Sequence, residues 1–101
     1  MKFIVENKNE NLLSLVRNLG YRVNSRSRGD FNCIKSIQGS DYPRFHLFIE
    51  EDENKFIFKL HLDQKKPSYS GSSAHSGEYE GKLVEEEAER IKKIVGQEDR
   101  T

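Results

Sequence analysis

The sequence predicts an α+β fold, a four-stranded antiparallel meander with an N-terminal and a C-terminal helix packed on one face. The periodic segments follow one another in the order helix, four strands, helix, and the last two strands pair to give one apolar face. The chain has 101 residues, 34% of them apolar and 34% charged, which suffices for one small domain and excludes a large two-lobed enzyme. We assign residues 1–95 to this domain and residues 96–101 to a flexible tail.

The first helix is expected to begin near Asn9, because asparagine caps helix N-termini well. Gly20 follows as a stop signal. Between these two positions, apolar residues recur at helical spacing, at Leu12, Leu13, Val16 and Leu19. The sequence leaves open whether residues 2–5 form a short edge strand or only lead into this helix.

Four strands follow the helix, each bounded by turn-forming residues. They are expected over residues 21–27, 31–38, 44–50 and 55–63. The turns between them fall at residues 28–30, 39–43 and 51–54. The alternation of apolar and polar residues is clearest in the last two strands, which can therefore be aligned with each other.

The alignment of these two strands sets Glu50 opposite Lys55. Every apolar residue on one face then meets an apolar partner, as the burial of a single face requires. These pairs are Phe45–Leu60, Leu47–Phe58 and Ile49–Phe56. The second face then carries the pairs Tyr42–Asp63, Arg44–His61, His46–Lys59 and Phe48–Ile57. If both helices cover the apolar face, the second face is open to solvent.

The stretch after the fourth strand, residues 64–82, is rich in serine and glycine and has neither a helical nor a strand period. A loop of this length in a small domain is generally functional or disordered, and the sequence leaves both possibilities open. The last helix is expected over residues 83–95, with glutamates at positions 85–87 in its first turn, where the helix dipole favours negative charge.

The open face and the loop carry the candidate functional residues. Cationic and imidazole side chains there suit a phosphate or carboxylate, tyrosines suit stacking or closure, and Asp63 is expected to orient His61. The candidate ligand-binding residues are Arg44, His46, Lys59, His61, Asp63, Lys65, Lys66, Tyr69, His75 and Tyr79. We therefore expect a non-enzymatic module that binds a small anionic ligand: a nucleotide, a short single-stranded nucleic acid or a phosphorylated metabolite.

Three alternatives compete with this hypothesis. The first is that any solvated face of an antiparallel sheet is polar. The second is a small hydrolase or metal-dependent enzyme, although the nearby cations would repel a metal ion. Its acid–base or metal-ligating residues would be His61, Asp63, His75 and Glu78. The third is a homodimer or another protein partner that covers the exposed Phe48–Ile57 pair.

Charge and composition argue against several further classes of function. The 17 basic and 17 acidic residues give no net charge, which argues against strong nonspecific binding to a nucleic-acid duplex. The chain contains no phosphate-binding loop, dinucleotide fingerprint or nucleophile elbow, and we expect no cofactor. No apolar run is long enough to span a membrane. The lone Cys33 excludes an internal disulfide and suits a reducing compartment, so we expect a cytoplasmic protein.

Three segments carry a resemblance to other sequences: DYPRFH (41–46), HLDQKKPSY (61–69) and AHSGEYEG (74–81). They resemble a family of small uncharacterised proteins from candidate-phylum bacteria. The resemblance covers most of the chain, from the first helix to the last. It implies no activity, cofactor or partner.

Overall fold

The chain forms an antiparallel sheet of five strands with two helices in a computed structural model, which describes residues 1–6, 11–64 and 73–98. Within the last helix, side chains are described for residues 81–96. The elements are β1 (Lys2–Glu6), α1 (Leu12–Asn18), β2 (Arg22–Ser27), β3 (Asp30–Ser36), β4 (Arg44–Asp52), β5 (Lys55–Asp63) and α2 (Ser73–Glu98). The α+β class is as predicted. The predicted count of four strands is wrong, because residues 2–6 form a fifth.

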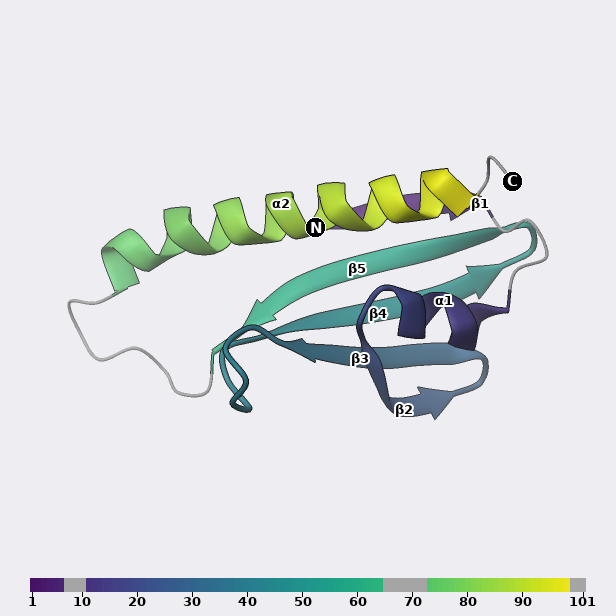
Figure 1. The fold of residues 1–101 in the computed structure, drawn as a ribbon, viewed down its shortest axis with the longest axis horizontal. Coiled ribbons are helices and arrows are strands. Elements are labelled where there is room, and N and C mark those ends of the chain that lie inside the picture. Colours follow the sequence, from purple (N-terminus) through teal and green to yellow (C-terminus); the bar gives the residue numbers. More distant parts are fainter. Residues whose placement is uncertain (7–10, 65–72, 99–101) are drawn as a thin grey trace.

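β1 extends the meander on the side of β5, so that the strand order is β1-β5-β4-β3-β2 (Figure 1). Its side chains alternate, with Phe3 and Val5 buried in the core and Ile4 exposed. Lys2 pairs with Lys59, and the ladder continues to Met1, whose carbonyl accepts a hydrogen bond of 2.7 Å from Leu60. A strand this short is not stable alone, so its formation depends on the edge that β5 offers.

The observed register of β4 and β5 differs from the prediction by two residues. Leu47 pairs with Leu60, and Ile49 with Phe58, whereas the prediction set Leu47 opposite Phe58. The reason is the turn: the strands stay paired as far as Asp52 and Lys55, so the turn has only two residues instead of four. Because side chains alternate with a period of two, a shift of two residues leaves every side chain on its predicted face.

Both helices cover the same face of the sheet. α2 runs lengthwise beside β5, and α1 lies over the part of the sheet nearer to β2 (Figure 1). Leu15 and Val16 of α1, with Ala88 and Ile91 of α2, join the core that the sheet builds on this side. The strands contribute Phe3, Val5, Phe31, Cys33, Phe45, Leu47, Ile49, Phe56, Phe58 and Leu60. Neither of the two described helices lies on the second face, which is called the open face below.

The start of each helix differs from the prediction. Asn11, and not Asn9, caps α1, because its side chain accepts a hydrogen bond of 3.2 Å from the backbone N–H of Ser14. α2 begins at Ser73, so the predicted loop over residues 64–82 is wrong for its second half, and α2 also continues through residues 96–98 of the predicted tail. Residues 73–82 are rich in serine and glycine, whose low helix propensity gave no indication of a helix in the sequence. Once residues 83–95 are helical, each added residue gains a hydrogen bond without a new nucleus.

A buried polar network joins α2 to the junction between α1 and β2. The Tyr21 hydroxyl donates to Glu87 at 2.7 Å, and Arg90 donates to the same carboxylate through two N–H groups, each at 2.8 Å. Arg90 also donates to the Leu19 carbonyl at 2.6 Å, at the end of α1. Glu87 is only 6% exposed. The predicted role of residues 85–87 in a first helical turn is therefore wrong, since they lie inside α2 and Glu87 faces the core.

Candidate anion-binding site

The open face is set by the same pairing that builds the core. Across β4 and β5 it carries the pairs Arg44–Asp63, His46–His61, Phe48–Lys59 and Glu50–Ile57. All the predicted members of these two strands lie on this face, but their partners differ. The two histidines face each other directly, and Phe48 lies opposite Lys59 instead of forming the predicted apolar pair with Ile57.

Charge on the open face is separated along the strands. A row here is a residue of β4 with its cross-strand partners on the same face. The described residues in the rows of Phe48, His46 and Arg44 include four cations and one carboxylate, namely Lys2, Arg22, Arg44, Lys59 and Asp63. The two rows toward the β4–β5 turn hold one cation and four carboxylates, namely Lys55, Glu6, Asp30, Glu50 and Asp52. We call the first group, with His46 and His61, the basic end, and the second group the acidic end. It lies where β5 ends, at its arrowhead in Figure 1.

His46 is the centre of the basic end. Its Nδ1 lies 3.2 Å from Oδ2 of Asp63, and its Nε2 is hydrogen-bonded to Oδ1 of Asn32. Both ring nitrogens thus face side-chain oxygens of neighbouring residues. The ring centroid lies 4.8 Å from that of Phe48 and 6.3 Å from that of His61. Asp63 therefore holds His46, in place of the contact predicted with His61.

Arg44 is positioned by an aromatic ring. Its guanidinium carbon lies 4.4 Å from the centroid of Tyr42, and its Nε lies 3.6 Å from Oδ2 of Asp63. This separation exceeds a hydrogen bond, and the buried Nε has no hydrogen-bond partner among the described residues. A buried donor in this state costs free energy unless something accepts from it.

Lys59 already forms an ion pair on the open face. Its ammonium lies 2.5 Å from a carboxylate oxygen of Glu50, where the basic and acidic ends meet. The hydrogen bond from Lys59 lowers the pKa of Glu50 below its ordinary value. A ligand at the basic end would therefore compete with Glu50 for Lys59 and with Asp63 for Arg44 and His46.

The other predicted site residues cannot be placed on this face. Lys65, Lys66 and Tyr69 lie outside the described residues. His75, Glu78 and Tyr79 belong to the first turns of α2, where side chains are not described. In the part of the chain that the structure describes, no three histidine, cysteine, aspartate or glutamate side chains group in a way that could hold a metal.

Arg22 is a site residue that the sequence did not predict. A regular hairpin continued from the pair Ser27–Asp30 would set Arg22 opposite Lys35, on the side of the helices. A register shift between Val23 and Ser25 moves it opposite Ile34, in the row of His46. Ile34 is 3% exposed although it is outside the core under the helices, so the side chains of the open face cover it. The alternation of the apolar residues Tyr21 and Val23, both on the core side, is the sequence signal that could have placed Arg22 on this face.

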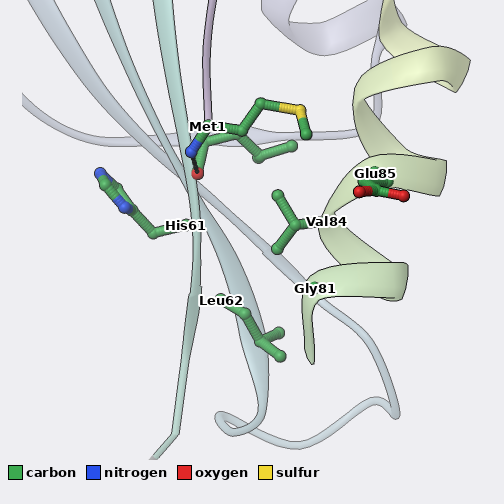
Figure 2. A pocket seen from close by; sticks show the side chains of 7 residues that line it. Met1, His61, Leu62, Gly81, Val84 and Glu85 are labelled. Atoms are coloured by element: carbon green, nitrogen blue, oxygen red, sulfur yellow. Dashed lines mark hydrogen bonds between the residues drawn. The ribbon is translucent and has the colours of Figure 1, made fainter. Parts of the chain in front are cut away.

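A pocket of about 430 Å³ lies beside the basic end, between β5 and α2. In Figure 2 the side chains of Leu62 and Val84 point into this space, and the ring of His61 points away from α2. His61 thus contributes its backbone to the pocket and its imidazole to the open face. The pocket and the basic end are separate features.

Comparison of the chain with protein-family models, with curated proteins and with solved structures finds no match. Among the described helices, none has the length and apolar character to cross a membrane.

Proposed function

We propose that this protein is a small non-enzymatic binding module that takes an anionic group on the basic end of its open face. The observation that carries the proposal is the separation of charge, which gathers four cations around two histidines with Asp63 as the only carboxylate among the described residues there. A phosphate or carboxylate is attracted to such a patch and repelled by the other end of the same face.

Arg44 supplies the best-oriented donors. Stacking on Tyr42 limits the positions of the guanidinium, whose planar fork matches a phosphate or carboxylate with two parallel hydrogen bonds. His61, whose ring is exposed to solvent, faces the same region from β5.

Asp63 keeps the site together when no ligand is bound. It lies against both Arg44 and His46, so one carboxylate holds both side chains in place. A ligand anion must compete with this carboxylate. Neutralising Asp63 should therefore strengthen anion binding, whereas removing Arg44 should weaken it.

The test is a titration with inorganic tripolyphosphate at low salt. Replacing Arg44 and His61 together with alanine should weaken binding about 10- to 100-fold, as expected when charge-assisted hydrogen bonds are lost. The matched control is the pair Lys82→Ala and Lys93→Ala, two exposed residues of α2, which covers the other face. Asp63→Asn should bind several-fold more tightly than the wild type. The proposal fails if the Arg44 and His61 variant binds as well as the control.

A further inference from the structure

Phe48 is an exposed aromatic residue in the middle of the sheet. It lies on β4, the third strand of five in spatial order, and is 37% exposed on the open face. Its neighbours along the strand, Leu47 and Ile49, are completely buried on the other face. A single exposed apolar side chain is ordinary on a protein surface, so the position of Phe48 carries meaning only through its surroundings.

Those surroundings combine a second ring with polar groups. The rings of His46 and Phe48 lie 4.8 Å apart at their centroids with 33° between their planes, so they pack against each other as a tilted aromatic pair. Asn32 and Lys59 lie opposite Phe48 on the two neighbouring strands. An aromatic pair with an amide on one side and an ammonium on the other can accept a flat heterocycle and reach its polar edge.

We infer that the ligand is a single-stranded nucleic acid, with a base stacked on Phe48 and His46 and its phosphates on Arg44, His61 and the cations beside them. This inference rests on the anion-binding function proposed above and names the class of ligand. An open antiparallel sheet with helices on its other face is a platform on which proteins stack unpaired bases. Every base has a π-face, so such stacking tolerates many sequences.

The spacing favours a strand over a free nucleotide. Positions on the same face of a strand are about 6.6 Å apart, so Phe48, His46 and Arg44 extend over about 13 Å. The cations also spread across the sheet, from Lys2 on β1 to Arg22 on β2. One compact anion cannot contact all of them, whereas a backbone with successive phosphates can. A duplex fits poorly because its bases are already stacked and paired.

The experiment compares three probes by fluorescence anisotropy or its competition form: an oligouridylate of about 8 nucleotides, the same strand with abasic sites, and inorganic tripolyphosphate. Phe48→Ala should weaken oligouridylate binding about 5- to 150-fold, the range expected for the loss of one stacked base. It should leave the abasic strand and tripolyphosphate unchanged. Phe48→Tyr, which keeps a ring, should bind like the wild type. Ile4→Ala, an exposed apolar change toward the acidic end of the same face, is the matched control.

The outcomes separate this inference from the proposed function. If the wild type binds tripolyphosphate through Arg44 but binds the abasic and base-bearing strands equally, stacking is overturned and anion binding stands. If Phe48→Ala changes the size of the protein in solution and not its affinity for oligouridylate, Phe48 serves a protein interface and the inference is overturned. If none of the three probes binds, both proposals fail together.

Discussion

Replacing Glu87 with glutamine would measure how strongly the buried network holds α2 to the rest of the fold. In the wild type, the carboxylate accepts one hydrogen bond from Tyr21 at 2.7 Å and two from Arg90 at 2.8 Å. Glutamine has nearly the same shape but only one oxygen. Its amide N–H₂ must then face a donor of Tyr21 or Arg90, so at least one of these hydrogen bonds is lost.

The expected loss of stability is about 2–3 kcal/mol. Removing one partner of a buried ion pair costs about 3–5 kcal/mol, because the remaining charge stays buried. The Arg90 side chain is 37% exposed, however, and keeps part of its hydration, which reduces the cost. The matched control is Glu89→Gln on the same helix. Glu89 is exposed and lies 3.6 Å from Lys92, so this change should cost less than about 0.5 kcal/mol.

The stability that Glu87 contributes should decrease as the pH falls. Burial raises the pKa of Glu87, but hydrogen bonds from Arg90 and Tyr21 outweigh burial and leave this pKa below its ordinary value. The contribution of Glu87 to the free energy of unfolding is therefore complete above the ordinary carboxyl pKa of about 4.3. It is lost as the pH falls through the lowered value in the folded protein.

Urea unfolding followed by circular dichroism, at neutral pH and at pH of about 3, gives both quantities. The difference between wild type and Glu87→Gln should shrink at the lower pH, and Glu89→Gln should follow the wild type at both. The reasoning is refuted if Glu87→Gln is as stable as Glu89→Gln at neutral pH. It is also refuted if the difference from wild type grows in acid.

Two further predictions concern the core under the helices. Ile91 is completely buried, so Ile91→Ala should lower the free energy of unfolding by about 2–5 kcal/mol, while Ile4→Ala on the open face should cost little; chemical denaturation checks both, and equal costs would contradict the assigned core. Burial raises the pKa of the Cys33 thiol to about 11, so alkylation by iodoacetamide near neutral pH should be slow in the folded protein and fast in urea; equal rates would contradict the burial.

The sequence largely predicted which side chains of β4 and β5 lie on the open face. The bounds of β5 are those predicted, and Arg44, His46, Lys59, His61 and Asp63 lie together on one face as expected. The reason is local: side chains alternate along any strand, so the apolar positions identify one face and the positions between them identify the other. An error of two residues in the register did not disturb this assignment.

The pairing of charges within that face was not predictable. A turn shorter than expected set His46 opposite His61 and Arg44 opposite Asp63, and the resulting ion pairs leave fewer free cations than the sequence implied. The cationic character that the sequence predicted for the open face holds only at the basic end. Cross-strand partners depend on turn length, which differs by single residues that leave no clear trace in composition.

The sequence by itself determined the α+β class, the amphipathic strands and the two faces of the sheet, because these follow from periods of two and of 3.6 residues along the chain. Only the tertiary structure decided that residues 2–6 form β1, that the pairing of β2 with β3 shifts between Val23 and Ser25, and that Glu87 is buried against Tyr21. Each of these depends on contacts between segments far apart in the chain. Such contacts are stabilised by the partner segment, and the residues of one segment alone do not reveal them.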